Sequence, residues 1–193
     1  MAESDRKKWD AKYSDTNHQI EHGEASYMLK QYHGQVTGKR ALDVACGTGR
    51  NALFLAALGF HVDALDISSV GLKRLAEAAV GLSGQVDTRV VDLDGFSPPV
   101  ETYDLIVVTN YLNRPLIPKL GASLLAGGIL VMDTFMLDQR NEVTHYNPDY
   151  LLKKSEFTEY FQTGYQILKF EEYCVKNSGC GMWKQAIAVR KLG

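Results

Sequence analysis

The stretch that decides the fold covers residues 42–52 and reads Leu42-Asp43-Val44-Ala45-Cys46-Gly47-Thr48-Gly49-Arg50-Asn51-Ala52. The apolar run over residues 41–45 predicts a short strand, and residues 51–58 predict a buried helix that stops at Gly59. Between them, Gly47 and Gly49 lack a Cβ atom, so the backbone of the loop can approach a ligand closely. Free N–H groups at the start of the helix can receive polar groups of that ligand. The stretch therefore predicts a strand, a ligand-binding loop and a helix.

Strands and helices continue to alternate after this loop. Ser68 is placed to cap a helix that ends before Gly81, and residues 115–125 form a second helical pattern, followed by a turn at the glycine pair 127–128. Four further short strands are expected, at residues 61–65, 86–91, 104–109 and 129–133. Parallel strands need long return connections, and helices supply them. The first two thirds of the chain therefore predict a doubly wound α/β fold.

The last third of the chain has a different pattern. A short helical stretch opens at residues 147–149, and two long strands are expected at residues 165–175 and 182–191. The six residues between these strands, 176–181, have the composition of a turn. Two strands joined so closely pair antiparallel, so the sheet is predicted to end in a hairpin.

Length and composition restrict the classes of function. The chain has 193 residues, 45% of them hydrophobic and 23% charged, which fits one globular domain over residues 1–193 and leaves little room for a second catalytic domain. The formal net charge is −2, so a nucleic-acid partner is not expected. No apolar stretch reaches the roughly 20 residues of a membrane span, and residues 1–13 lack the pattern of a secretory signal, so we expect a cytoplasmic protein. The sequence does not predict the oligomeric state.

Neither metal binding nor cysteine chemistry is indicated. The cysteines are Cys46, Cys174 and Cys180, and they form no CxxC pair of the metal-binding type. Cys46 lies in the glycine loop without an obvious general base, which favours a small buried thiol over a nucleophile. His18 and His22 have a spacing that a metal site allows, but polar residues on an exposed linker need no ligand to explain them. We therefore expect no metal site.

Three acidic residues narrow the choice of ligand, because a Gly-x-Gly loop alone also fits a dinucleotide. Asp66 follows Gly47 by nineteen residues and ends the second predicted strand, where it can accept hydrogen bonds from ribose hydroxyls. Asp43 precedes the glycines, where its charge would repel a pyrophosphate but attract a cationic sulfonium ligand that carries an amino group. Asp92 ends the third predicted strand and is placed to meet the exocyclic amine of an adenine.

With these landmarks the chain resembles the class I S-adenosylmethionine-dependent methyltransferases, and specifically their small tellurite-resistance and thiopurine-type branch. The resemblance runs from about Trp9 to Arg190. It implies a Rossmann-like, seven-stranded sheet of order 3-2-1-4-5-7-6 with the last strand antiparallel. It also implies an N-terminal helical cover (residues 1–38), a cofactor-binding sheet (39–135) and a pocket wall with the closing hairpin (136–193). The cofactor would be S-adenosylmethionine, with S-adenosylhomocysteine as product.

The same resemblance implies the roles of the landmark residues: Asp43 lies by the methionine part, Asp66 by the ribose and Asp92 by the adenine. Tyr13 would lie near the cofactor carboxylate on an N-terminal helix, although Trp9 and Tyr13 fit an aromatic pair that docks this helix on the core equally well. The family loop usually has glycine where this chain has Ala45, so the first turn must tolerate a methyl group. The full set of implied cofactor-binding residues is Tyr13, Asp43, Ala45, Gly47, Gly49, Asn51, Asp66, Ile67, Asp92, Leu93 and Asn110.

The methyl acceptor is expected where the fourth predicted strand ends, at the carboxyl edge of the sheet. Asn110 and Tyr111 can orient a small acceptor there, and Phe135 can line its pocket. Arg114 can receive an anionic acceptor or, as an alternative, bond a neighbouring carboxylate. Residues 109–115 lack the Asn-Pro-Pro-Tyr pattern that resembling enzymes use for nucleobase or glutamine nitrogens, which disfavours those substrates.

These observations favour methyl transfer from S-adenosylmethionine to a small acceptor, such as a thiol, a chalcogen oxyanion or a small metabolite. No catalytic acid or base is predicted, because an in-line displacement depends chiefly on positioning. Two alternatives stay open. One is a non-catalytic protein that binds an adenosyl ligand, and the other is an NAD-dependent oxidoreductase, which would want a further substrate domain.

Overall fold

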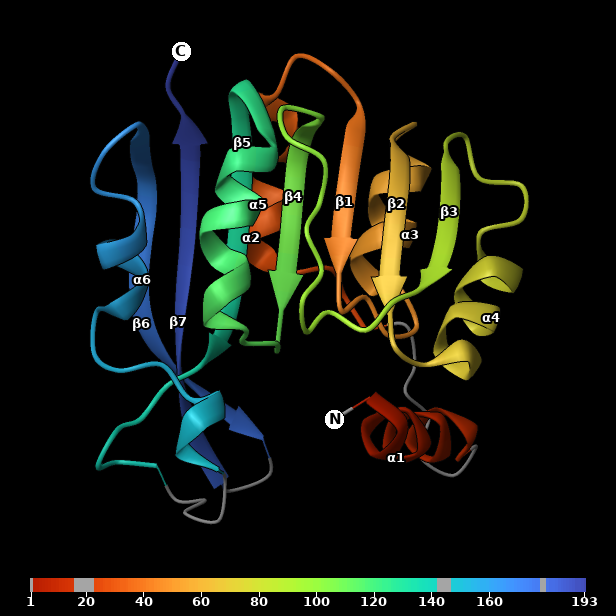
Figure 1. Cartoon of the computed structure of the whole chain (residues 1–193), viewed down its shortest axis with the longest axis horizontal. Coiled ribbons are helices and arrows are strands. Elements are labelled where there is room, and N and C mark those ends of the chain that lie inside the picture. Colours follow the sequence, from red (N-terminus) through yellow and green to blue (C-terminus); the bar gives the residue numbers. More distant parts are fainter. Residues whose placement is uncertain (1, 16–22, 142–146, 178–179) are drawn as a thin grey trace.

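The computed structural model describes residues 2–15, 23–141, 147–177 and 180–193. Seven strands form one sheet of order β3-β2-β1-β4-β5-β7-β6 (Figure 1). Strands β1 to β5 run parallel where they pair, and β7 is antiparallel to both β5 and β6. The predicted α/β fold and strand order are therefore confirmed. The strands are β1 (Arg40–Val44), β2 (His61–Asp66), β3 (Gln85–Val90), β4 (Tyr103–Thr109), β5 (Leu124–Phe135), β6 (Tyr165–Asn177) and β7 (Cys180–Lys191).

Helices cover the sheet on both faces, and each face has its own apolar core. In Figure 1, α2 and α3 lie behind the sheet, α5 lies in front of it, and α1 lies beyond the carboxyl ends of β1 and β2. One core cluster joins α2, α3 and α4 to the sheet, and the other joins α5 and α6 to its opposite face. The helices are α1 (Ala2–Ser14), α2 (Tyr27–Tyr32), α3 (Arg50–Ala57), α4 (Ser69–Ala78), α5 (Ile117–Ser123) and α6 (Glu156–Tyr160), with short 3-10 turns at His33–Gln35, Arg114–Leu116 and Pro148–Tyr150. None of the described helices is long and apolar enough to cross a membrane.

Two predicted boundaries are wrong, both for reasons of strand pairing. The helix expected to reach residue 125 ends at Ser123, and β5 already begins at Leu124. The glycine pair is therefore an irregularity near the start of β5, where Gly127 has a φ of 79° and the pairing with β4 shifts register. In the hairpin, the ladder continues to the pair Asn177 and Cys180, so only residues 178–179, which lie outside the described part, separate β6 from β7.

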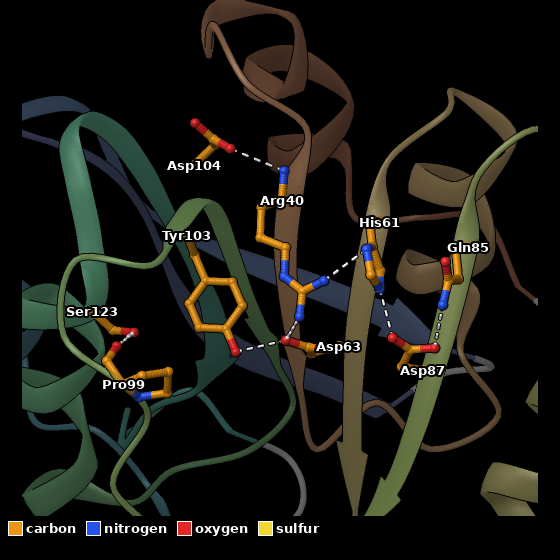
Figure 2. Close-up of polar contacts among 9 residues, drawn as sticks. All are labelled: Arg40, His61, Asp63, Gln85, Asp87, Pro99, Tyr103, Asp104 and Ser123. Carbon is orange, nitrogen blue, oxygen red and sulfur yellow. Dashed lines mark hydrogen bonds and ion pairs between the residues drawn. The ribbon is translucent and has the colours of Figure 1, made fainter.

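The amino ends of β1, β2 and β3 carry a polar network on one face of the sheet (Figure 2). The connection from β3 to β4 contains no helix that would cover this face. Arg40 donates to Asp63 Oδ2 over 2.6 Å and to His61 Nδ1 over 2.7 Å, and Tyr103 donates to the same Asp63 oxygen over 2.8 Å. Because a guanidinium only donates, Nδ1 of His61 must accept, and the ring carries its proton on Nε2. The Nε2–H group donates a hydrogen bond to Asp87 Oδ2 over 2.6 Å. Atoms of His61, Asp63 and Asp87 that could bind a metal ion lie within 4.8 Å of one another. These atoms are already engaged by Arg40 and by the hydrogen bond between His61 and Asp87.

Candidate functional site

The loop after β1 adopts left-handed backbone at three positions. Ala45 has a φ of 55°, Gly47 of 57° and Gly49 of 85°. A Cβ on Gly49 would collide with the side chain of Leu75, and one on Gly47 would lie 2.6 Å from the hydroxyl oxygen of Tyr13. Both glycines are therefore required by space as well as by conformation. Ala45 holds its left-handed conformation at a cost of about 1–2 kcal/mol. The turn therefore accommodates the methyl group of Ala45, as predicted, but with strained backbone.

Asp43 is buried beneath this loop with one oxygen unpaired. The residue lies next to the last position of β1 and is 1% exposed, and its Oδ2 accepts a hydrogen bond from the amide of Ala52 over 3.0 Å. Oδ1 has no partner, and the only other such buried side-chain atom in the described part of the chain is Ser26 Oγ. Burial raises the pKa of Asp43 to about 8. A ligand with a cationic or N–H group would supply the missing donor to Oδ1 and stabilise the ionised carboxylate.

Asp66 ties the end of β2 to the glycine loop. Its Oδ2 accepts from the amide of Gly47 over 2.7 Å, and its Oδ1 accepts from the amide of Ser68 over 2.9 Å. Burial raises the pKa of Asp66, against these two hydrogen bonds. Each carboxylate oxygen keeps a second lone pair that can accept from a ribose hydroxyl. Ile67, the next residue, is half-buried at the same edge.

The predicted adenine end is organised by an asparagine that the sequence reasoning missed. Asp92 is exposed and accepts from the amide of Asp94 over 3.0 Å, and Leu93 is buried. Asn113 Nδ2 lies 3.3 Å from the Leu93 carbonyl oxygen, 3.2 Å from Asp94 Oδ1 and 3.4 Å from the Tyr111 hydroxyl. Tyr111, predicted beside the acceptor, therefore has its hydroxyl at the turn that would hold the adenine.

Asn51 holds three elements together at the edge of the loop. Its Oδ1 accepts from the amide of Ser26, which precedes α2, over 2.9 Å, and its Nδ2 donates to Thr109 Oγ1 at the end of β4 over 3.1 Å. The residue is buried. Both ends of its carboxamide thus bond other parts of the protein, so we infer that Asn51 holds the elements around the loop in place.

Helix α1 lies against the loop and the start of α4. Asp10 Oδ1 accepts from the Ser68 hydroxyl over 2.6 Å and from the amide of Val70 over 3.3 Å, which places a carboxylate at a helix N-terminus. Trp9 and Tyr13 stack with ring centroids 5.7 Å apart, and the Tyr13 hydroxyl approaches Gly47. Burial raises the pKa of Tyr13. Both predicted roles of this aromatic pair therefore fit the geometry. His18 and His22 lie outside the described residues.

Arg114 takes up the second of its two expected roles. Its Nε and Nη2 bond the carboxylate of Glu156 at 2.6 and 3.1 Å, and its Nη1 and Nη2 also donate to the carbonyl oxygens of Asp149 and Leu151. The hydrogen bond to Glu156 raises the pKa of Arg114. With these contacts the guanidinium fastens α6 to the end of β4, and we do not assign it to an anionic acceptor.

Four side chains form a network around the buried pair Lys184 and Asp133, beyond β4, that sequence reasoning also missed. Lys184 Nζ lies 2.8 Å from Asp133 Oδ1 and 2.7 Å from Asn110 Oδ1, and the Tyr173 hydroxyl donates to Asp133 Oδ2 over 2.8 Å. The ammonium lies 4.8 Å from the centroid of the Phe135 ring. The network gathers residues of β5, β6 and β7 beside the end of β4. A charged residue at the end of the apolar run 129–133 was the one sequence signal for it.

Cys46 has the environment of an unreactive thiol. Its Sγ lies 3.8 Å from the Gly47 carbonyl oxygen. Burial, and then the carboxylates of Asp43 and Asp66, raise the pKa of Cys46 well above its usual value. This geometry supports the interpretation as a structural thiol.

Comparison with known protein families identifies the family to which the chain is related. The family model of the tellurite resistance protein TehB matches residues 4–178. The chain belongs to the TehB family. The family resemblance predicted from the glycine loop and the three acidic residues is therefore confirmed.

The TehB relatives resemble the chain over part of their length. A probable S-adenosyl-L-methionine-dependent methyltransferase TehB of Haemophilus influenzae strain 10810 is 30% identical over 104 residues, covering 49% of this chain and 36% of the relative. Hemagglutinin 1 of Eikenella corrodens is 28% identical over 140 residues, covering 69% of this chain and 46% of the relative. The chain thus spans less than half the length of these curated relatives.

Solved structures show the same fold. The crystal structure of TehB from Haemophilus influenzae superposes with a TM-score of 0.75 at 20% identity, covering 96% of this chain and 66% of that one. A geranyl diphosphate C-methyltransferase from Streptomyces coelicolor, crystallised with S-adenosyl-L-homocysteine, gives a TM-score of 0.66 at 12% identity over 86% of this chain and 76% of that one. The fold of the TehB family and of more distant methyltransferases is thus shared.

Proposed function

We propose that this chain binds S-adenosylmethionine and transfers its methyl group to a small acceptor. The observation that carries the proposal is the unpaired Oδ1 of Asp43, buried beneath the glycine loop. A pyrophosphate at this position brings no N–H donor for Oδ1, and its negative charge would oppose ionisation of Asp43, which disfavours NAD. The names of the Haemophilus relatives support the same conclusion.

The residues around the loop fit the parts of this cofactor. Asp43 would hold the amino group, Asp66 the ribose, and Asp92 with Leu93 the adenine, while Gly47 supplies the close backbone. When bound, the cofactor supplies an electrophilic methyl group on a sulfonium. The protein then has to hold the acceptor in line and keep water away, which needs no acid or base at a fixed position.

The acceptor would lie beyond the ends of β4 and β5. Asn110 is exposed at the end of β4, and Phe135 is half-buried at the end of β5. Thiols, chalcogen oxyanions and small metabolites are the classes we propose, because the net charge of −2 disfavours a polyanion.

A non-catalytic adenosyl-binding protein is the second candidate. Two residues predicted to contact the acceptor are used elsewhere: Tyr111 at the adenine turn and Arg114 with Glu156. With fewer side chains free to bind an acceptor, the chain could bind the cofactor without transferring its methyl group.

Calorimetry and a transfer assay separate the candidates. We expect S-adenosylhomocysteine to bind and NAD not to bind, and binding of NAD alone would overturn the proposal. Radiolabelled S-adenosylmethionine is then offered with thiols, selenite and tellurite. Label transferred to any of them establishes catalysis. Binding without transfer to any of them favours the adenosyl-binding protein.

A further inference from the structure

Lys184 is a charged residue in a buried position, and three neighbouring groups surround its ammonium. Its side chain is 8% exposed and that of its partner Asp133 is 6% exposed. Nζ donates to Asp133 Oδ1 and Asn110 Oδ1, and it lies over the ring of Phe135. Of the three N–H bonds of the ammonium, two go to these oxygens, and its charge also lies over the ring. Lys184 is therefore engaged chiefly by the protein.

The ammonium instead fixes the orientation of the Asn110 carboxamide. Because Lys184 can only donate, the atom that faces it must be the oxygen, and the Nδ2 of Asn110 must point away. Nδ2 has no hydrogen-bond partner among the described residues, and Asn110 is exposed. Two N–H donors are thus presented at the surface of the site, held there by a buried charge.

This amide lies at the edge where the ligand loop begins. Val44 of β1 pairs with Val108 of β4, so Asn110 leaves β4 beside the point where the glycine loop leaves β1. The backbone of Asn110 has a φ of 58°, and its main-chain N–H donates to the carbonyl oxygen of Asp133 over 2.8 Å. Left-handed backbone outside glycine is found preferentially at functional sites, where the surrounding structure holds it. Asn110 is held both through its backbone and through its side chain.

We propose that Lys184 is a positioning residue that turns the amide N–H pair of Asn110 toward the methyl acceptor. The proposal rests on the proposed methyltransferase function and defines which acceptors its site takes. Two N–H donors hold a lone pair on an oxygen or sulfur of the acceptor. They disfavour a protonated amine, which brings only donors of its own. Lys184 acts through Asn110 and does not touch the acceptor.

The alternative is that Lys184 and Asp133 form an ion pair with a purely structural role. The two roles predict different results for the variant Lys184→Met. Without the ammonium, Asp133 Oδ1 is buried without a donor, so the carboxamide of Asn110 is expected to flip and donate Nδ2 to it. If the role is purely structural, Asn110 keeps its orientation.

NMR of the full chain with 15N-labelled asparagine side chains tests the orientation. Asn110→Asp identifies the Asn110 signals, because it keeps an oxygen for Lys184 and removes the N–H pair. In the wild type we expect the Asn110 side-chain protons to exchange with water as fast as exposed amides do. In Lys184→Met exchange should slow by about tenfold, and in Lys184→Arg it should stay as in the wild type. Lys191→Met, at the other end of β7, is the control for loss of a lysine.

Addition of probes to the complex with S-adenosylhomocysteine tests the acceptor. Sodium selenite or 2-mercaptoethanol should shift the Asn110 signals and leave those of Asn113, at the adenine turn, in place. The proposal is overturned by slow exchange in the wild type, by unchanged exchange in Lys184→Met, or by failure of both probes to shift Asn110. If Lys184→Met does not fold, wild-type exchange and the probe shifts decide. Failure of the proposed function is a separate result, because it would appear as absence of S-adenosylhomocysteine binding.

Discussion

The amide of Gly47 donates to Oδ2 of Asp66 over 2.7 Å, so the loop after β1 and the end of β2 are one hydrogen-bonded unit. A residue placed to hold a ribose therefore also holds the loop that a cofactor would lie on. Loss of this carboxylate should act on binding and on folding together.

Asp66→Ala is expected to weaken S-adenosylhomocysteine binding by about 1–3 kcal/mol, because ribose hydrogen bonds are lost in a buried site. It should also lower the free energy of unfolding by about 1–3 kcal/mol, because the amides of Gly47 and Ser68 lose their partner. Calorimetry and urea unfolding measure the two effects. Asp66→Asn keeps one acceptor oxygen and should lose less stability. Unchanged affinity in Asp66→Ala would show that the residue has no contact with the ligand.

Ala45→Gly should raise the free energy of unfolding by about 0.5–1 kcal/mol. The left-handed backbone at φ 55° is relieved, and the greater freedom of glycine in the unfolded chain offsets part of the gain. Urea unfolding measures the change. The control is Ala57→Gly at the end of α3, an exposed helical position where glycine should cost about 0.5–1 kcal/mol. Equal losses at both positions would refute the strain at Ala45.

Arg114→Met should lower the free energy of unfolding by about 1–3 kcal/mol, since the buried carboxylate of Glu156 loses its partner. Arg114→Met with Glu156→Gln should recover part of this loss, because no charge then stays unpaired. Neither protein should change S-adenosylhomocysteine affinity. A large loss of transfer activity in a well-folded Arg114→Met would instead return Arg114 to the acceptor site.

Asp43 should make the protein less stable as the pH rises from about 4 to 8. Burial raises its pKa in the folded protein to about 8, from an unfolded value of 3.8. The native state thus binds the proton more tightly, so the contribution to stability is complete below the unfolded pKa and is lost as pH rises through 8. Asp43→Asn should remove this dependence and be the more stable protein at pH 8 by about 1 kcal/mol or more. Parallel pH profiles of wild type and variant would refute the raised pKa.

The sequence predicted those parts of the site that one short segment determines. The glycine loop, the cap at Ser68 and the acid at the end of β2 each need particular residues in a particular local conformation, so residue type revealed them. The network around Lys184 was missed, because it joins strands whose register is set by the whole sheet.

The contacts of the predicted acceptor residues depend on other parts of the chain for a related reason. Tyr111 and Arg114 follow β4, but their side chains are directed by Asn113 and by Glu156, and Glu156 is forty-two residues away from Arg114. The boundaries at Leu124 and Asn177 depended on strand pairing in the same way.

The buried carboxyl group of Asp43 is proposed to receive the amino group of an adenosyl cofactor. Calorimetric titration with S-adenosylhomocysteine at pH 7, repeated in buffers of different ionisation enthalpy, tests it most directly. With its pKa raised to about 8, Asp43 is largely protonated before the ligand binds, so binding should release close to one proton and tighten as the pH rises toward 8. Asp43→Asn should bind more weakly and release none. Absence of binding, or binding with the same proton release in wild type and Asp43→Asn, would contradict the account.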